Sequence, residues 1–413
     1  MSPRGLTLTE IRHTDAARRF EPTEHYGALR EQCPVHHVVE HDPPFYAVSR
    51  FEDVVEVLRR NDLWSNRHGP GVFHQESGVL GSADDPDHAR QRRVLRAALV
   101  PPVVARMEPF LRDATDALLD AVDPVGGDAV TCEFVSAIAE PLPALAIADL
   151  LGVDPGLHDD FRRWSNESVA ALTGGDVAGY QAAKAAVEDC VADGVATRRA
   201  MIGDHTADDD LLGNQLPDDV MSRLAIAQHN GVLDDREVRH LGYQLLVAGH
   251  ETTTSLLGML LFRMLERPEI MAAVRADRSL IPTAIEEGLR FDSPVHGLFR
   301  TNLTDCELHG TTIAADTKLQ VLYAAANRDP ARFDHPDEFR LDRDRSELGR
   351  HVAFGWGIHF CIGAPLARLE TRIVLEQMLD RWSHIELAGE PVRNDSFVLH
   401  GLTHLPITVR RTA

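Results

Sequence analysis

A glycine-rich stretch near the C-terminal end constrains the fold more than any other part of this chain. It reads FGWGIHFCIGAPLARLE, runs from Phe354 to Glu370 and holds a single cysteine, Cys361. Glycine tolerates positive φ and lets the backbone approach a flat ligand closely. A helical pattern of apolar residues follows at once, and Pro365 falls where the first turn of a helix tolerates proline. The stretch therefore predicts a tight loop that leads directly into a helix.

The chemistry of Cys361 follows from its place at this junction. Backbone N–H groups and the positive end of the helix dipole favour a thiolate there. A thiolate can serve as a nucleophile or as an axial ligand of a metal. A lone cysteine is most often a small buried hydrophobic residue, so the residue type alone leaves these interpretations open.

The pattern FGxGxHxCxG in this stretch resembles the haem-binding loop of the cytochromes P-450. The matching residues are Phe354, Gly355, Gly357, His359, Cys361 and Gly363. The resemblance implies that Cys361 binds the iron of haem b as a thiolate, and that His359 and Gly363 also contribute to the cofactor site. A cysteine hydrolase would need a histidine base and an orienting acid. Besides His359, nothing in the segment completes such a triad.

The composition of the chain limits its possible partners and its cellular compartment. The 413 residues carry a net charge of −22, which argues against nucleic acid as a partner because phosphate binding needs clustered positive charge. No apolar run reaches membrane-spanning length, and the N-terminal segment lacks the apolar core of a signal peptide. The five cysteines are scattered without a CxxC pair, which fits a reducing compartment. We therefore expect a cytoplasmic protein without a membrane anchor.

A helix is expected from Asp85 onward, in the sequence DDPDHARQRRVLRAALV. Aspartate is a favoured N-cap, and Pro86 suits the first turn. His88 and Arg92 are four residues apart and share one face of this helix. By itself the pair is typical of a solvated basic face. The family resemblance implies instead that His88, Arg92 and the later Arg300 donate hydrogen bonds to the carboxylates of haem.

A long apolar helix is expected from Asp234, its N-cap, to about Glu266. The sequence AGHETT, which begins at Ala248, interrupts the apolar surface, and its glycine and threonines predict a local distortion. The motif is similar to the family's oxygen-binding groove. The resemblance implies that Ala248 lines the cofactor, that Thr252 orders water and that Glu251 relays protons from solvent. In isolation, the same polar residues could simply stabilise a kinked helix.

Glu287 and Arg290 lie three residues apart in a further helical segment. On a helix surface such a pair contributes only about 0.2–0.5 kcal/mol. The ExxR spacing resembles the buried ion-pair network of the same family, and Arg343 matches its third member. We predict a structural role for the three residues, which would hold the Cys361 loop in place rather than take part in the reaction.

Candidate substrate contacts come from the apolar residues of a Gly-, Ser- and Asp-rich loop, Trp64 to His88, and of two later segments. Long loops within compact domains are usually functional, and the resemblance implies that this loop covers the substrate pocket. The candidates are Val72, Phe73, Val79, Leu80, Val295, Leu298, Phe299 and the hairpin tip from Leu399 to Thr403. They favour a small lipophilic substrate but do not identify it.

The matches to the family extend from about Pro44 to the end of the chain. They imply a mainly α, single-domain cytochrome P-450 fold over residues 1–413, rich in helices and with small peripheral β-sheets. The implied function is that of a soluble bacterial class I monooxygenase. Such an enzyme inserts one atom of O2 into a C–H bond and receives electrons from NAD(P)H through a ferredoxin reductase and a ferredoxin. Two alternatives stay open: a haem-binding sensor or carrier without turnover, and a peroxide-driven oxygenase, a type that typically lacks the acid–alcohol pair.

An acidic ferredoxin is the partner that the charge pattern favours. Although the chain is strongly acidic, arginines gather on the segments expected to flank the thiolate side of the haem. They are Arg90, Arg93, Arg96, Arg350, Arg368 and Arg372. A basic patch on an acidic protein attracts and orients a small acidic partner. The alternative is that some of these arginines pair with neighbours such as Glu370, and exposed pairs of this kind contribute little.

Overall fold

The computed structural model describes residues 23–75, 77–123, 129–172, 177–203 and 207–412. The chain divides into two compact units, each built from segments that are distant in sequence. The first unit comprises Met1–Asp84, Met259–Cys361 and Val392–Thr403, and the second comprises Asp85–Gly258, Ile362–Pro391 and His404–Ala413. The single-domain organisation inferred from the sequence stays a prediction.

A five-stranded sheet organises the first unit. Its strand order is β1–β2–β8–β5–β3, with β2 and β8 parallel and the other neighbours antiparallel. These strands are β1 (Val35–Val38), β2 (Phe45–Val48), β3 (Trp64–Ser65), β5 (Leu298–Asn302) and β8 (Lys318–Val321). Two further sheets have two strands each: β6 (Cys306–Leu308) with β7 (Thr311–Ile313), and β10 (Val392–Arg393) with β11 (Leu402–His404).

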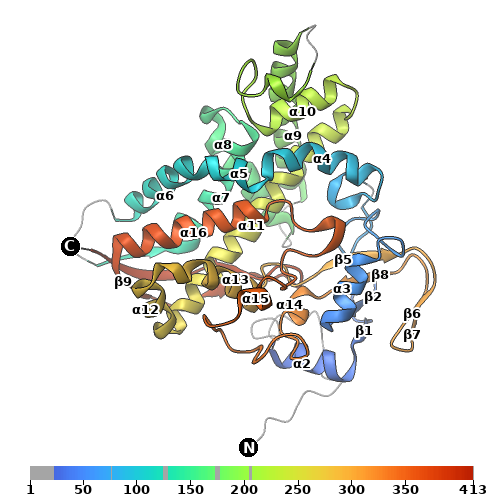
Figure 1. Ribbon diagram of the computed structural model, residues 1–413, viewed down its shortest axis with the longest axis vertical. Coiled ribbons are helices and arrows are strands. Elements are labelled where there is room, and N and C mark those ends of the chain that lie inside the picture. The colour runs from blue at the N-terminus through green and yellow to red at the C-terminus, as the bar shows by residue number, and fades with distance from the viewer. Residues whose placement is uncertain (1–22, 76, 124–128, 173–176, 204–206, 413) are drawn as a thin grey trace, which may run out of the picture. The chain divides into compact units, whose positions relative to one another are not determined.

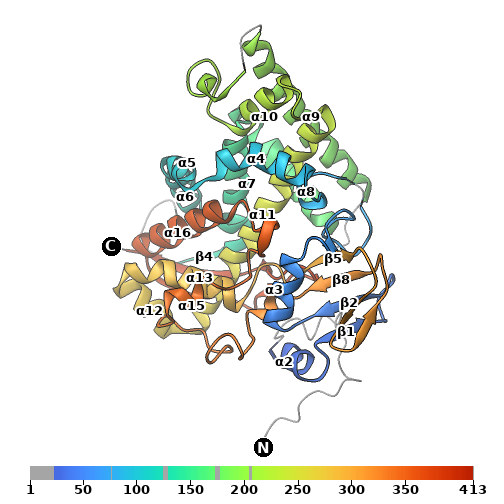
Figure 2. The same cartoon turned by 45° about the vertical axis from the view of Figure 1, so that its right-hand side comes forward.

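Short helices accompany this sheet, and Figure 2 shows α2 and α3 beside the strands β1, β2 and β8. The helices and 3-10 turns of the whole first unit are α2 (Thr23–Gln32), α3 (Phe51–Arg59), η2 (Leu80–Ser82), α12 (Pro268–Ala276), η7 (Arg278–Leu280), α13 (Ile281–Phe291), α14 (Tyr323–Ala326), α15 (Arg345–Leu348) and η8 (Gly357–His359).

Side chains of the sheet alternate between two core clusters, because successive residues of a strand point to opposite faces. Val48 packs with the apolar side of α3 in one cluster. Phe45 packs with side chains of α2 and with Phe299 in the other, which also contains Val72. The side chain of Phe299 is 0% exposed among these core residues. The expectation that Phe299 contacts the substrate is therefore wrong, because its strand register turns it into the core.

Helices form most of the second unit. They are α4 (Asp87–Leu99), α5 (Pro101–Val104), η3 (Ala105–Met107), α6 (Glu108–Val122), the π-helix η4 (Val135–Ala139), α7 (Pro141–Leu151), η5 (Pro155–Leu157), α8 (His158–Leu172), α9 (Val177–Ile202), η6 (Asp209–Leu211), α10 (Val220–His229), α11 (Asp235–Glu266, of which Met259 onward belongs to the first unit) and α16 (Ala364–Arg381). A three-stranded sheet has the order β4 (Val130–Glu133), β12 (Pro406–Arg411), β9 (Trp382–Leu387). Figure 1 shows α16 alongside α6. The predicted mainly α fold with small sheets is confirmed.

The long helix α11 begins with the predicted cap. The Glu237 N–H donates to Asp234 Oδ1 at 2.7 Å, and the Asp234 N–H donates to Glu237 Oε2 at 3.0 Å, so two backbone donors are satisfied reciprocally. Arg90 and Gln91 of α4 also donate to Glu237 Oε1, at 2.6 and 2.8 Å, and so fasten α4 to the first turn of α11. By length and composition α11 could cross a membrane. However, 72% of its apolar 18-residue stretch is buried inside the protein, as in a core helix.

The predicted ion-pair network is buried in the first unit. Arg290 Nε and Nη2 donate to the two carboxylate oxygens of Glu287, at 2.7 and 2.8 Å. Arg343 Nε donates to Glu287 Oε1 at 3.0 Å. Both Glu287 and Arg290 are 0% exposed, and a bidentate pair in such a place is costly to break.

Asn327 connects this network to the glycine-rich loop. Arg290 Nη1 donates to the Asn327 carbonyl at 2.9 Å, and the Val352 N–H donates to Asn327 Oδ1 at 2.7 Å. The Gly355 N–H then donates to the Val352 carbonyl at 2.8 Å. A continuous chain of hydrogen bonds thus runs from Arg290 into the loop that carries Cys361, in agreement with the predicted structural role.

Replacing Glu287 tests this role. Glu287→Gln should lower the free energy of unfolding by about 3–5 kcal/mol, because it leaves two buried guanidinium groups without their carboxylate. Chemical unfolding followed by far-UV circular dichroism measures the loss. Arg60→Ala is the matched control, since Arg60 pairs with Asp62 while 47% of its side chain is exposed, and this variant should unfold like the parent. Equal losses in the two variants would contradict the structural role.

Candidate active site

The glycine-rich loop folds tightly against its own backbone and against α3. Gly355 and Gly357 have φ angles of 70° and 73°, in the left-handed region that favours glycine. A Cβ atom at Gly357 would lie 2.6 Å from the Leu58 carbonyl oxygen, so a larger residue does not fit. The Cys361 N–H donates to the Phe354 carbonyl at 2.8 Å and closes the loop. Cys361 is thereby held half-buried at the end of the loop.

Trp356, the bulky residue within this loop, anchors it to α3. Its ring packs against the core cluster that contains Phe51. The Arg59 guanidinium carbon lies 5.4 Å from the centroid of the Trp356 ring, which is a cation–π contact. The large side chain therefore fixes the loop instead of crowding the half-buried cysteine.

Four cysteines are held as neutral thiols by their surroundings. Burial raises the pKa of all four thiols, and it raises the pKa of the Cys132 thiol to about 11. They are Cys33, Cys132, Cys190 and Cys306. Because the thiolate is the form that binds a metal, these environments oppose ligation. Cys361 is therefore the cysteine whose position best suits a metal ligand.

Arg300 is a buried cation in the first unit that no described carboxylate pairs with. Its side chain is 4% exposed. Its Nη1 donates to the Phe299 carbonyl at 2.9 Å, and its guanidinium also hydrogen bonds to the Tyr323 phenol. A buried charge without a counter-charge is costly, so this position suits an anion that comes from outside the chain.

Tyr323 is a site residue that sequence reasoning missed. It is buried, it is hydrogen bonded to Arg300, and it lies close enough to Cys361 to interact with it electrostatically. Burial raises the pKa of the Tyr323 phenol, and the Arg300 guanidinium opposes part of that rise. Tyr323 thus neighbours both Arg300 and the loop that carries Cys361, since its hydroxyl would lie 3.8 Å from a Cβ atom at Gly355. The one signal in the sequence is an aromatic hydroxyl at the end of an apolar run, LQVLYAAA.

In the second unit, α4 buries one side and exposes another. His88 is 2% exposed, and its Nδ1 lies 3.3 Å from Asp85 Oδ1. Arg92, one turn later, is half-buried, whereas Arg93 and Arg96 are exposed. Exposure thus separates His88 and Arg92 from Arg93 and Arg96, whereas Arg90 is half-buried like Arg92.

The AGHETT stretch of α11 has an accessible side. Ala248 is exposed, and Glu251 and Thr252 are half-buried, although most of the helix is buried. The Thr252 hydroxyl donates to the Ala248 carbonyl at 2.7 Å. The helix runs without interruption from Asp235 to Glu266, so the expected distortion does not break it. A threonine hydroxyl can share the carbonyl four residues earlier with the backbone N–H, which keeps the helix intact.

His250 anchors the same stretch on its buried side. Its Nδ1 lies 2.6 Å from Ser165 Oγ, and its Nε2 lies 3.1 Å from the Glu140 carbonyl. Burial lowers the pKa of His250 to about 4, so the imidazole is neutral at pH 7. At Gly249 a Cβ atom would lie 2.6 Å from Ile147 Cδ1 of α7, so glycine permits this close approach. These contacts determine which side of α11 stays accessible.

Two of the arginines expected to dock a ferredoxin take part in ion pairs. Arg90 Nη2 donates to Glu237 at 2.6 Å. Arg372 Nη2 donates to Glu108 at 2.7 Å, and its Nη1 donates to Glu376 at 3.0 Å. Their charge is largely neutralised by these carboxylates, so neither is well placed to attract a partner.

Other members of the arginine group keep their charge toward solvent. Arg93, Arg96 and Arg350 are exposed. Glu370, the neighbour considered as a pairing partner, is 1% exposed and forms no salt bridge with a described residue. Burial raises the pKa of Glu370 to about 8, so its carboxyl group is mostly protonated at pH 7 and does not offset these arginines.

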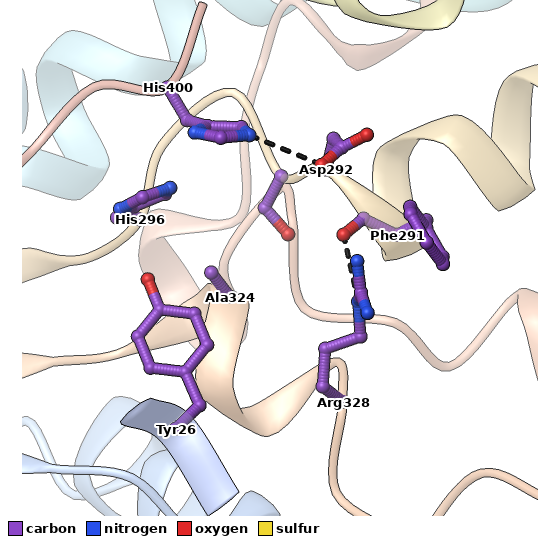
Figure 3. A pocket seen from close by; sticks show the side chains of 8 residues that line it. Tyr26, Phe291, Asp292, His296, Ala324, Arg328 and His400 are labelled. Atoms are coloured by element: carbon purple, nitrogen blue, oxygen red, sulfur yellow. Dashed lines mark hydrogen bonds and ion pairs between the residues drawn. The ribbon is translucent and has the colours of Figure 1, made fainter. Parts of the chain in front are cut away.

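In a polar pocket elsewhere in the first unit, the charged side chains interact with one another and with backbone carbonyls. Figure 3 shows His400 pointing toward Asp292, with Nε2 and Oδ1 3.2 Å apart, and Arg328 Nε donating to the Phe291 carbonyl at 2.9 Å. Arg263 Nε also donates to Asp292 Oδ2 at 2.6 Å. Although burial acts to raise it, Arg263 and His400 hold the pKa of Asp292 well below its usual range. This cluster is an internal ion network rather than a second reactive site.

The candidate site residues divide between the two units. Arg300, His359 and Cys361 belong to the first, whereas His88, Arg92, Ala248, Glu251, Thr252 and Gly363 belong to the second. His359 is half-buried in η8, and Gly363 is the N-cap of α16. Within the units, Tyr323 lies beside Arg300 and near the loop of Cys361, and Thr252 is hydrogen bonded to Ala248.

Comparison with known proteins agrees with this arrangement. The family model described as Cytochrome P450 matches residues 177–407. Pentalenic acid synthase from Streptomyces avermitilis is 35% identical over 404 residues, which cover 94% of this chain and 94% of that protein. Erythromycin C-12 hydroxylase from Saccharopolyspora erythraea is 33% identical over 92% of both chains. The solved structure of a cytochrome P450 from Chondromyces apiculatus gives a TM-score of 0.84 at 33% identity, covering 97% of this chain and 98% of that chain.

The chain therefore belongs to the cytochrome P450 family. It is an oxidoreductase of the monooxygenase class, and its cofactor is haem b, bound through a cysteine thiolate. The described residues fit this cofactor. Cys361 ends a loop whose geometry requires glycine, and the buried Arg300 forms no ion pair with a carboxylate of the described residues.

Replacing Cys361 tests the proposed iron ligand. Cys361→Ala should lower the haem content and abolish the thiolate-type carbonyl spectrum, because the other cysteines are held as thiols. Cys306→Ala, a half-buried cysteine of the same unit, is the matched control and should keep both properties. Far-UV circular dichroism checks that each variant is folded. A thiolate-type spectrum that persists in folded Cys361→Ala would assign the ligand to another residue.

Proposed function

We propose that this enzyme hydroxylates a C–H bond of a small lipophilic substrate in the cytoplasm, with electrons from NAD(P)H passed through a ferredoxin reductase and a ferredoxin. The observation that carries the proposal is the acid–alcohol pair. Glu251 and Thr252 lie on the accessible side of an otherwise buried helix. A sensor or carrier has no need of such a proton relay, and peroxide-driven oxygenases typically lack the pair.

The proposed roles at the cofactor follow from residue chemistry. Cys361 would supply the thiolate, and Ala248 and Gly363 would border the macrocycle. The donors proposed for its carboxylates are His88, Arg92, Arg300 and His359. The bound haem supplies the activation of O2. Each charge-assisted hydrogen bond to a carboxylate contributes about 1.5–3 kcal/mol, so these donors would act mainly in retaining the cofactor.

Proton delivery is assigned to the accessible side of α11. The Thr252 hydroxyl donates to the Ala248 carbonyl, which leaves its oxygen lone pairs able to accept a hydrogen bond from an ordered water molecule. Glu251 is half-buried beside it and carries the group that can exchange protons with solvent. We therefore propose that Thr252 orders water and that Glu251 relays protons to it.

Thr252→Ala should leave substrate binding unchanged but divert reducing equivalents to peroxide, and Glu251→Gln should slow turnover and change its solvent isotope effect. The measurement is product formed per NAD(P)H consumed. Thr254→Ala is the matched control, because the Thr254 hydroxyl donates to the His250 carbonyl at 3.0 Å in the same way but is buried. This control should stay coupled. If Thr252→Ala and Glu251→Gln are both as tightly coupled as the parent, the assignment of the proton relay is wrong.

A small lipophilic substrate is supported by the names of similar proteins. Pentalenic acid synthase and erythromycin C-12 hydroxylase are among the relatives. A cytochrome P450 from Bacillus megaterium, solved in complex with corticosterone, gives a TM-score of 0.81 at 29% identity, covering 95% of this chain and 99% of that chain. A screen of lipophilic compounds for a spectral shift of the ferric haem, followed by product analysis with NAD(P)H and redox partners, tests both the substrate class and turnover. Binding without any product would favour the sensor or carrier.

An acidic ferredoxin is the proposed electron donor, and the exposed residues Arg93, Arg96 and Arg350 are the arginines that support it. Arg93→Glu should raise the apparent KM for ferredoxin without changing substrate binding. Haem reduction by ferredoxin should also slow as salt rises, because exposed charges are screened beyond about 10 Å at 0.1 M salt. Stopped-flow reduction across a salt series measures this effect.

Arg410→Glu is the matched control for this prediction, since Arg410 is exposed on β12 and undergoes the same change in charge. It should reduce like the parent. A rate that responds to neither salt nor Arg93→Glu would place the docking site elsewhere.

A further inference from the structure

Three side chains of the first unit, none of them among the proposed haem-site residues, converge at one place. His68, His74 and Asp316 each offer one ligand atom, and these atoms lie within 4.8 Å of one another. Two imidazole nitrogens and a carboxylate oxygen form a donor set typical of zinc, which often leaves a fourth position to water. We infer that His68, His74 and Asp316 form a binding site for a divalent transition-metal ion, with Zn2+ as the best match.

The loop that carries both histidines folds back on itself. The Gln75 N–H donates to the His68 carbonyl at 3.0 Å, so the residue before it, His74, returns to the side of His68. Gly69, with a φ of 77°, makes the sharp turn between them. Lys318 Nζ donates to the carbonyls of His68 and Gly69, both at 2.9 Å, and holds the turn against β8. The two histidines are thus positioned by backbone contacts before any metal binds.

The third ligand lies on a turn that is fixed independently. Asp316 has a φ of 60°, which aspartate tolerates better than most residues. Its N–H donates to the Asn302 carbonyl at 2.9 Å, and the Thr317 N–H donates to Asn302 Oδ1 at 2.8 Å. A preorganised set of this kind binds a metal with little cost of ordering.

A cation already bridges two of the three ligands. Arg67 Nε donates to His68 Nε2 at 3.0 Å, and Arg67 Nη2 lies 3.2 Å from Asp316 Oδ1. The position therefore accommodates positive charge between an imidazole and a carboxylate. Because 50% of the Arg67 side chain is exposed, it can move into solvent when a metal replaces it.

The histidine rings are close enough to share one metal after a small rotation. Their centroids are 4.3 Å apart and the rings are nearly parallel, at 7°. His68 Nδ1 is buried and has no hydrogen-bond partner among the described residues. His74 is exposed, so its ring can turn about χ2 until both lone pairs point at one ion. Metal binding would then clamp the loop from His68 to Gln75 onto the turn at Asp316.

Titration of the haem-loaded enzyme with Zn2+ tests the site, after removal of any polyhistidine tag. Isothermal titration calorimetry should show one Zn2+ bound per chain through this site. His68→Ala, His74→Ala and Asp316→Asn should each weaken its binding by at least about tenfold, because even groups that only support a metal ligand contribute that much. His309→Ala is the matched control and should bind like the parent, since His309 pairs with Asp53 at 2.8 Å and belongs to no cluster of three potential ligands among the described residues.

Two further measurements separate a specific site from general surface binding. Arg67→Ala should bind Zn2+ more tightly than the parent, because it removes the competing cation. Zn2+ should also slow amide hydrogen exchange between residues 69 and 75 in the parent but not in His74→Ala. The inference is overturned if the parent does not bind Zn2+, if the three ligand variants bind it as tightly as the parent, or if exchange in this loop is indifferent to the metal. None of these measurements depends on turnover. A failure of the metal-site inference would therefore leave the proposed monooxygenase function untouched.

Discussion

The carboxylate of Glu287, shared by Arg290 and Arg343, is the interaction on which the first unit depends. Between α14 and α15, residues 327–344 form no helix or strand, so their backbone carbonyls need other hydrogen-bond donors. The two guanidinium groups supply them, donating to the carbonyls of Asn327, Pro336, Glu338, Asp334 and His335. The buried charges thus replace regular secondary structure. They hold an irregular segment firmly enough to support the loop of Cys361.

A second shared carboxylate, Glu237, has a comparable role in the second unit. It caps α11 and receives Arg90 and Gln91 from α4, so one side chain sets the end of one helix and the position of another. Hydrogen bonding from Arg90 lowers the pKa of Glu237 from 4.5 to about 2. Because the folded value is the lower one, this stabilisation is complete above pH 4.5 and is lost as the pH falls toward 2.

Local signals in the sequence predicted what depends on spacing along the chain. The Asp234–Glu237 cap, the extent of α11 and the Glu287–Arg290 pair follow from such spacings and agree with the structure. Contacts between distant segments were not predictable: Arg90 meets Glu237 across 147 residues, and the Tyr323 phenol meets the Arg300 guanidinium. The sequence also did not show which side of a buried strand faces the core. In β5 the residues LFRTN mark neither side of the strand as the core, and the structure turns Phe299 into that core.

If Arg300 binds a carboxylate of haem as proposed, its burial links the stability of this protein to its haem content. Without a carboxylate beside it, the guanidinium is a charge removed from water with little compensation. An anionic cofactor that pairs with Arg300 binds the native state and not the unfolded chain, and therefore shifts the folding equilibrium by mass action. Haem supply and folding are then thermodynamically linked. Apoprotein made when haem is scarce would be the species most exposed to cellular proteases, and the amount of enzyme would follow the availability of its cofactor.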